Sequence, residues 1–159
     1  MTGVFGPRPK SITQDLSGKC VDADIAGGTG NGQWVKQWDC LGSGQQNQAV
    51  YVEPIYIGGG DWAEYYTLKF AHNSRCVDFD LNNLGNGGVV QQWDCIAGVP
   101  TNQRFNIVRG VGLSNAFQSI RNGRCIDLDI ASGPYTNGTK FQQWDCNLQR
   151  QQRFTLQER

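Results

Sequence analysis

The chain has 159 residues and a mass of 17.6 kDa, enough for one ordinary domain or two very small ones. Fourteen basic and fourteen acidic side chains cancel to a net charge of zero, which argues against a protein that binds nucleic acid or an anionic membrane surface. Charged residues make up only 18% of the chain, whereas 16 Gln and 12 Asn make it rich in amides. No apolar run approaches the length of a membrane span, so we expect no membrane insertion.

The first feature along the chain is the spacing of its six cysteines. Within consecutive pairs they are 20, 19 and 21 residues apart, and no pair has the C-x-x-C spacing of a zinc site. We therefore expect three disulfides, one per segment, and a secreted protein in an oxidising compartment; a cytosolic location is the alternative. The first ten residues lack the apolar core of a signal peptide. The cysteines are Cys20, Cys40, Cys76, Cys95, Cys125 and Cys146.

Three internal repeats with a period of about 50 residues dominate the sequence. Each repeat has a cysteine motif, then a Q-W-D-C motif, and then an amide pair that precedes an apolar stretch. The cysteine motifs are SGKCVDADI at 17–25, NSRCVDFDL at 73–81 and NGRCIDLDI at 122–130. The second motifs are VKQWDC at 35–40, VQQWDC at 90–95 and FQQWDC at 141–146. The amide pairs are Asn47-Gln48, Asn102-Gln103 and Gln151-Gln152.

The cysteine motifs alternate like half-buried β-strands. In the first copy, Val21, Ala23 and Ile25 share one face, and Asp22 and Asp24 share the other. Gly- and Asn-rich stretches supply turns, and no segment has helical periodicity. Each repeat therefore predicts four short strands, one of them before each cysteine motif, most clearly at 66–70 and 116–121.

Three repeats of four strands are too few for a typical propeller, which needs four to eight blades. They predict an all-β fold, a β-trefoil, in which the apolar faces meet in one shared core. We expect a single domain over residues 1–159, with repeats at about 11–52, 66–108 and 113–156 and an insertion at 53–65.

The elements C-[VI]-D, Q-x-W-x-C and N-Q-x-F, in three ordered copies from about residue 11 to 156, resemble the ricin B-type lectins. The same repeat occurs in the ricin-type carbohydrate-binding modules attached to many glycosidases. The resemblance implies one shallow sugar pocket per repeat. In it, the Asp after the first cysteine accepts hydroxyl hydrogen bonds, an aromatic ring stacks on the sugar, and amides complete the contacts.

The chemistry of these residue types independently suits a sugar. A sugar ring has an apolar face of C–H groups, for which Trp offers a large flat area. A carboxylate accepts hydroxyl protons in charge-assisted bonds, and amides both donate and accept. We expect the most complete site in the second repeat, where Asp78 is the acceptor, Trp93 the platform, and Gln91 and Asn102 the amide partners.

The other two repeats depart from this pattern. The third offers a site with a longer amide where the family usually has Asn: Asp127, Gln142, Trp144 and Gln151. The first has a cation in place of the expected Gln: Asp22, Trp38, Asn47 and Lys36. Lysine donates but cannot accept, and it can pair with Asp22 instead, so we expect the first site to be altered or silent.

Structural roles are alternatives for each of these residues. The repeated Trp could lie in the core, and the repeated Asp could cap turns. We expect the terminal Gln48, Gln103 and Gln152 to bond buried backbone. The second acids, Asp24, Asp80 and Asp129, have no family role, and we expect them to anchor loops.

Metal binding and catalysis have little support. The stretch from Asp78 resembles a D-x-D-x-N calcium loop but has Asn83 and Val89 where an EF-hand needs Gly and Glu. Asp22 and Asp24 would lie roughly 6–7 Å apart, as in glycosidases, but the pair recurs in three repeats that are too short for three deep clefts. We expect no metal, no cofactor and no enzymatic activity.

The sequence therefore predicts a lectin for galactose, N-acetylgalactosamine or related glycans, carried by glycoproteins, glycolipids or polysaccharides. One alternative is a xylan- or arabinan-binding module cut from a larger glycosidase or toxin. Another is a β-trefoil protease inhibitor acting through residues 53–65, which include Tyr56, Trp62 and Tyr65.

Overall fold

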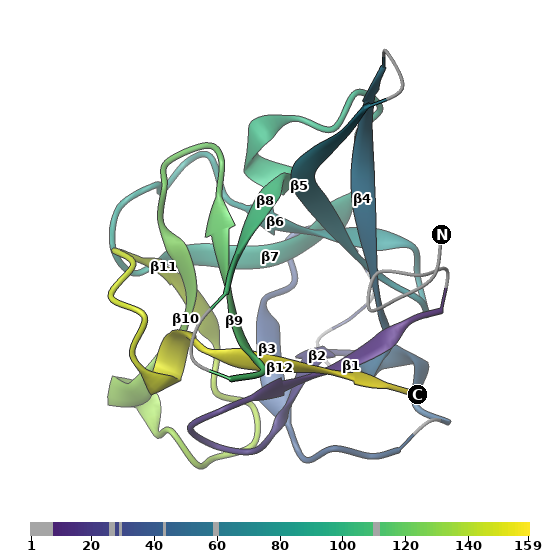
Figure 1. Cartoon of the computed structure of the whole chain (residues 1–159). Coiled ribbons are helices and arrows are strands. Elements are labelled where there is room, and N and C mark those ends of the chain that lie inside the picture. Colours follow the sequence, from purple (N-terminus) through teal and green to yellow (C-terminus); the bar gives the residue numbers. More distant parts are fainter. Residues whose placement is uncertain (1–7, 26–27, 29, 43, 59–60, 110–111) are drawn as a thin grey trace.

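The computed structural model describes residues 8–25, 28, 30–42, 44–58, 61–109 and 112–159, and for 56–58 and 61–64 the backbone alone. Within them lie twelve β-strands and short 3-10 turns (Figure 1). The strands are β1 Lys10–Gln14, β2 Cys20–Ala23, β3 Val35–Trp38, β4 Val50–Gly58, β5 Asp61–Phe70, β6 Arg75–Phe79, β7 Gly88–Asp94, β8 Phe105–Arg109, β9 Ser114–Ser119, β10 Cys125–Leu128, β11 Phe141–Trp144 and β12 Phe154–Glu158. The turns are η1 Gln46–Gln48, η2 Thr101–Gln103, η3 Ile130–Ser132 and η4 Arg150–Gln152. No helix in this described part is long and apolar enough to cross a membrane.

The strands repeat one four-strand unit three times, as the sequence predicts. Antiparallel pairing closes a ring through β1, β4, β5, β8, β9 and β12 and back to β1. The other strands form the hairpins β2–β3, β6–β7 and β10–β11. The second strands of these hairpins touch one another. A closed barrel with three such hairpins is a β-trefoil, so the predicted fold class is confirmed.

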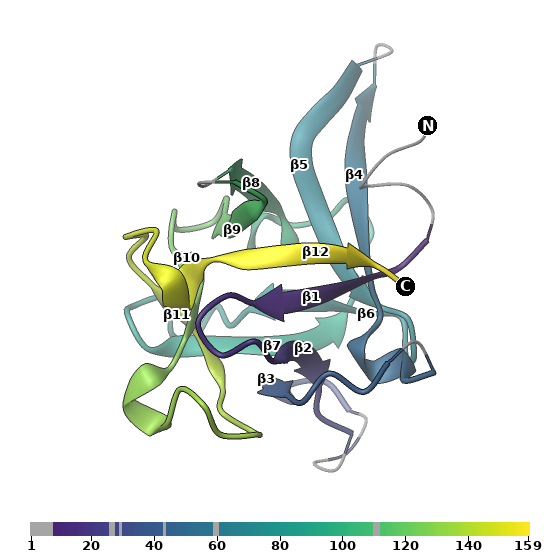
Figure 2. The same cartoon turned by 60° about the horizontal axis from the view of Figure 1, so that its bottom comes forward.

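The hairpin of β4 and β5 projects beyond the barrel in both views (Figures 1 and 2). Residues 53–65, which the sequence suggests as an insertion between repeats, form its outer part, with Tyr56 opposite Trp62 and Gly58 opposite Asp61. Residues 59 and 60 and the side chains of Tyr56 and Trp62 lie outside the described residues. The protease-inhibitor hypothesis falls on that region and gains no support.

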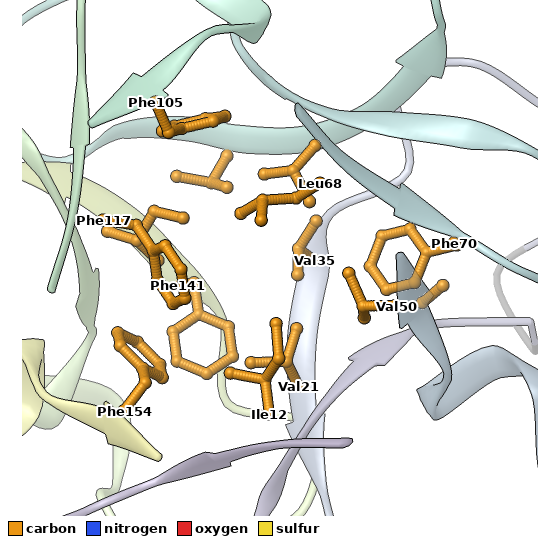
Figure 3. Close-up of a cluster of buried hydrophobic side chains, with 14 of the residues drawn as sticks. Ile12, Val21, Val35, Val50, Leu68, Phe70, Phe105, Phe117, Phe141 and Phe154 are labelled. Carbon is orange, nitrogen blue, oxygen red and sulfur yellow. The ribbon is translucent and has the colours of Figure 1, made fainter. Parts of the chain in front are cut away.

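Apolar side chains from all three repeats meet inside the barrel (Figure 3). Val21 and Ala23 of β2 point into this core, as their alternation predicts. The prediction that Ile25 continues the buried face is wrong: β2 ends at Ala23, and Ile25 is 52% exposed.

The buried side chains at equivalent positions of the three repeats differ in size, although the strand pairing repeats. On the inner strands the first repeat places Val35, the second Val90, and the third the much larger Phe141, all of them buried. Ala23 of the first repeat corresponds to Phe79 and Leu128 in the others. Despite these unequal side chains the core is closely packed: the cavity lined by Val35, Phe141 and their neighbours has a volume of only about 10 Å³.

Each repeat is stapled by one disulfide, which confirms the predicted pairing. The bridges are Cys20–Cys40, Cys76–Cys95 and Cys125–Cys146. Each closes a loop of about 20 residues, worth on the order of 3 kcal/mol in the chain-entropy account of disulfides. Such bridges are typical of proteins in an oxidising, extracellular environment.

The first and last strands close the ring side by side (Figure 2). Their register runs from Lys10 opposite Glu158 to Gln14 opposite Phe154. Lys10 is only 2% exposed, and its Nζ lies 3.0 Å from Oε1 of Glu158. The two ends of the described chain are therefore fastened to each other.

Candidate functional site

In the second repeat, a cage of amides holds one carboxylate. Asp78 lies on β6 opposite Gln91 of β7 and is 3% exposed. Its Oδ1 accepts a hydrogen bond from Gln91 Nε2 at 3.0 Å. Its Oδ2 accepts from Asn102 Nδ2 at 3.1 Å and from Gln103 Nε2 at 2.9 Å. The structure thus brings the predicted acceptor and both predicted amides together.

The third repeat has a smaller cage. Asp127 accepts from Gln142 Nε2 at 3.0 Å and from Gln152 Nε2 at 2.8 Å. Gln151, expected to stand in for Asn, is not brought to this carboxylate: its Nε2 lies 3.4 Å from Oε1 of Gln149, at the surface. The longer side chain turns outward, so the third site has one amide fewer than the second.

In the first repeat, Lys36 does not pair with the principal carboxylate, Asp22. Lys36 Nζ lies 2.6 Å from Oδ2 of Asp24, so the suggestion that it pairs with Asp22 is wrong. Asn47 Nδ2 instead lies 3.1 Å from both oxygens of Asp22, and Gln48 Nε2 donates at 2.9 Å. Lysine is long enough to reach the second acid of the motif, and this pairing leaves Asn47 to serve both carboxylate oxygens.

The second amide of each terminal pair has the predicted structural role. Gln103 Nε2 also donates to the carbonyl of Asp94 at 2.9 Å, and its Oε1 accepts from the backbone N–H of Ile96 at 3.1 Å. Gln48 and Gln152 do the same in their own repeats. These side chains tie the carboxylate to the backbone that follows the Trp.

Burial raises the pKa of Asp22, Asp78 and Asp127 above the ordinary 3.8, and the amide hydrogen bonds lower it in part. Each carboxylate has therefore exchanged water for a few fixed donors. A desolvated, oriented carboxylate is a strong acceptor for a further hydroxyl.

Of the second acids, Asp80 and Asp129 hold the loops that follow them, whereas Asp24 pairs with Lys36 of the neighbouring strand. Asp80 Oδ1 accepts from the backbone N–H of Asn82 at 3.0 Å, and Asp129 Oδ2 accepts from the Ser132 hydroxyl at 2.6 Å. Among the described residues, no group of three or more His, Cys, Asp or Glu is placed to hold a metal ion.

The three repeated tryptophans lie at the surface, so the alternative that they belong to the core is wrong. Trp38, Trp93 and Trp144 are 43%, 38% and 39% exposed. Each sits opposite the first cysteine of its repeat, at the end of the inner strand. The apolar positions beside them are taken by the buried valines and Phe141. Each exposed ring therefore presents a flat apolar face to the surface.

Carboxylate, amides and Trp line open pockets in two repeats. The pocket of the second repeat has a volume of about 400 Å³, and that of the first about 200 Å³. The larger is lined by Asp78, Asp80, Leu81, Asn82, Gln91, Trp93, Ile96, Pro100 and Asn102. The smaller is lined by Asp22, Asp24, Ile25, Trp38, Leu41, Gln45 and Asn47. The aliphatic walls Ile25, Leu41, Leu81 and Ile96 were not foreseen, although they recur three residues after the Asp and after the Trp.

Sequence reasoning also missed the middle Gln of each Trp motif. Gln37 is fully buried, and its Nε2 donates to the carbonyls of Pro134 and Thr136 at 2.9 and 3.0 Å. Gln143 donates to the carbonyl of Val89 at 2.8 Å. These bonds join one repeat to another. The feature of the sequence that could have indicated this role is a Gln directly before the Trp in all three copies.

Comparisons with known proteins agree with this fold. The designed threefold-symmetric protein ThreeFoil superposes with a TM-score of 0.77 at 21% identity, covering 94% of this chain and 98% of its own. The Macrolepiota procera ricin B-like lectin, solved with lactose, gives 0.75 at 16% identity, covering 99% and 100%. The exo-beta-1,3-galactanase 1,3Gal43A from Clostridium thermocellum gives 0.79 at 23% identity, covering 97% of this chain but only 31% of the enzyme.

At these identities the structures establish the fold alone. No curated protein sequence matches the chain. The sequence profile of the ricin-type beta-trefoil lectin domains, however, matches residues 56–144, which is more than half of the chain. The chain therefore belongs to the ricin-type beta-trefoil lectin domain-like family.

Proposed function

We propose that the protein is a non-catalytic lectin that binds glycans in up to three shallow pockets, one per repeat, on a single domain spanning residues 1–159. One recurring observation carries this proposal. In every repeat a buried carboxylate is held by amides, and an exposed Trp lies on the neighbouring strand of the same hairpin. No packing requirement of the barrel demands that combination three times.

The hydrogen-bonding capacity of the second site suits a hydroxyl-rich ring. Asn102 Nδ2 donates to Asp78 and to the carbonyl of Phe79, at 3.1 and 3.2 Å. Its Oδ1 therefore remains as an acceptor for a ligand. Gln91 uses Nε2 on Asp78 and keeps a second N–H to donate. The pocket can therefore both donate and accept, while Trp93 covers the C–H face of the ring.

The three sites should differ in strength. The second has the complete set of groups and the larger pocket. The third lacks an Asn beside Asp127, and in the first Lys36 is committed to Asp24. We therefore rank the second site first and expect the other two to bind more weakly.

The sugars we propose are galactose, N-acetylgalactosamine or related glycans on glycoproteins, glycolipids or polysaccharides outside the cell. The lactose complex of the Macrolepiota procera lectin supports this class. A polysaccharide-binding module within a longer enzyme or toxin is the alternative setting. The chain corresponds to 31% of the galactanase it resembles, which supports that alternative.

A glycan array probed with the wild type and with a variant carrying Trp38→Ala, Trp93→Ala and Trp144→Ala tests the proposal. We expect the variant to lose all binding, whereas Trp34→Ala, outside the pockets, should retain it. Circular dichroism checks that both variants fold. Single pockets of millimolar affinity correspond to only about −4 kcal/mol, so the array must present glycans multivalently. Unchanged binding by a folded triple variant would overturn the proposal.

A further inference from the structure

Each pocket tryptophan is fastened by a loop of a different repeat. Asn31 belongs to the first repeat, yet its Oδ1 accepts the backbone N–H of Asp94, next to Trp93, at 2.8 Å. Its Nδ2 donates back to Oδ2 of Asp94 at 3.1 Å. Arg75 Nε also donates to Asn31 Oδ1, at 2.9 Å. One asparagine thus binds both the backbone and the side chain of the residue that follows the pocket tryptophan.

The glycine after this asparagine holds the other side of the tryptophan. The backbone N–H of Gly32 donates to the carbonyl of Gln92, which precedes Trp93, at 2.8 Å. Gly32 has φ +94°, and a Cβ built on it would stand 3.9 Å from the indole ring of Trp93. The tryptophan is therefore bracketed, on both flanking peptide groups, by one Asn-Gly step from another repeat.

The same contacts recur around the ring. Asn86 of the second repeat accepts the N–H of Asp145 at 2.8 Å and donates to its carboxylate at 3.0 Å, beside Trp144 of the third. Asn137 of the third repeat accepts the N–H of Asp39 at 2.9 Å and donates to its carboxylate at 3.0 Å, beside Trp38 of the first.

The flanking cation and glycine also recur in these two copies. Arg124 and Lys19 take the place of Arg75, each donating to its asparagine at 2.9 Å. Gly87 and Gly138 donate to the carbonyls that precede Trp144 and Trp38, at 2.7 and 2.8 Å. The order is cyclic: the asparagine of the first repeat binds beside the tryptophan of the second, that of the second beside the third, and that of the third beside the first.

We propose that Asn31, Asn86 and Asn137 are positioning residues for the sugar pockets, each acting on the tryptophan of the next repeat and not of its own. This inference rests on the proposed sugar-binding function of the tryptophans. Without the asparagine side chain, the peptide N–H that follows the tryptophan loses its fixed acceptor, and only the glycine N–H still holds the peptide group that precedes it. The ring must then be ordered by the ligand, which lowers affinity about two- to tenfold, the cost of immobilising one side chain.

The fold should tolerate the change, because Asn31 and Asn86 are exposed and Asn137 is half-buried. The variants Asn31→Ala, Asn86→Ala and Asn137→Ala serve as controls for one another, since each should affect a different pocket. The readout is the indole N–H signal of each tryptophan in protein labelled with ¹⁵N-Trp, first without ligand and then titrated with methyl β-galactoside.

In Asn31→Ala we expect the signal of Trp93 to shift and its order parameter to fall, with Trp38 and Trp144 unchanged. Asn86→Ala should move Trp144, and Asn137→Ala should move Trp38. Titration should show weakened binding at the same tryptophan. If each variant disturbs its own repeat, all three equally or none, the inference is overturned. If the galactoside shifts no indole of the wild type, the proposed sugar class fails, while the ligand-free signals still decide the coupling.

Discussion

Replacing Asp78 with Asn should weaken sugar binding at the second site while leaving the stability of the fold nearly unchanged. The carboxylate receives one amide donor on Oδ1 and two on Oδ2. The new side chain has a single oxygen, and it belongs at the Oδ2 position because Gln103 cannot turn: its Nε2 is also bound to the Asp94 carbonyl and its Oε1 to the Ile96 N–H. Gln91 lines the open pocket and can turn its amide to offer Oε1 to the new NH₂ group.

The magnitudes follow from this count of partners. Every buried group keeps a partner, and the variant removes a charge whose pKa burial has raised, so the free energy of unfolding should change by no more than about 1 kcal/mol. A sugar hydroxyl instead loses a charged acceptor worth about 1.5–3 kcal/mol, which weakens binding by about 10- to 150-fold. By contrast, Asp78→Ala removes the acceptor of three amide donors at once, and each donor that stays buried without a partner, foremost that of Gln103, costs about 1–3 kcal/mol.

Urea unfolding and titration calorimetry of the wild type, Asp78→Asn and Asp78→Ala measure the two effects. We expect the Asn variant to unfold near the wild type and to bind far more weakly at the second site, while the Ala variant loses both properties. Binding by Asp78→Asn at wild-type strength would refute the role of the carboxylate as sugar acceptor. Unfolding of Asp78→Asn at the midpoint of Asp78→Ala would refute the account of the amide cage.

The further predictions concern pH dependence, the first pocket and the core. Because burial raises the pKa of the three pocket carboxyls above 3.8, glycan binding should be lost as pH falls through the raised values, before exposed carboxyls titrate; calorimetry at stepped pH checks this. Because its pKa is raised, the Asp78 carboxyl binds more protons in the folded protein than in the unfolded chain between pH 3.8 and the raised pKa. The free energy of unfolding of the wild type, relative to Asp78→Asn, should therefore fall as pH rises through this range. Lys36→Gln should release Asp24, supply the amide found in the other repeats and strengthen the first site; an unchanged Trp38 signal on titration would contradict this. Phe141→Val, which installs the residue of the other two repeats, should cost about 2–3 kcal/mol of stability in urea unfolding, because no neighbour fills the space.

The repeats in the sequence are sufficient to predict the trefoil and the disulfide pairing, and each proposed acceptor, Asp22, Asp78 or Asp127, does receive hydrogen bonds from amides of its own repeat. This succeeded because alternation and spacing are local properties of a strand. The failures concern side-chain reach. Lys36 and Gln151 stand at the motif positions of Gln91 and Asn102, but their longer side chains reach other partners, Asp24 and Gln149.

The contacts between repeats could not be predicted for a different reason. The bonds of Gln37 to residues 134 and 136, or of Asn31 to Asp94, join segments that only the closed ring brings together. The unequal core has the same origin. Val35 and Phe141 occupy equivalent positions and line the same small cavity, so their sizes are matched to each other and not to the repeat.

The pairing of β1 with β12 also has a consequence for how the protein folds. Each inner hairpin joins strands about 15 residues apart, whereas Lys10 and Glu158 are separated by 148 residues. Pairing across so long a chain is entropically slow, so the ring should close after the hairpins have formed, on a timescale of roughly milliseconds to seconds. Stopped-flow refolding monitored by tryptophan fluorescence would contradict this if all tryptophans reached their final signal in the first phase. The tryptophan of every pocket is held in part by a neighbouring repeat. We therefore expect a folding intermediate with formed hairpins and an open ring to contain all the residues proposed to contact sugar but no complete pocket.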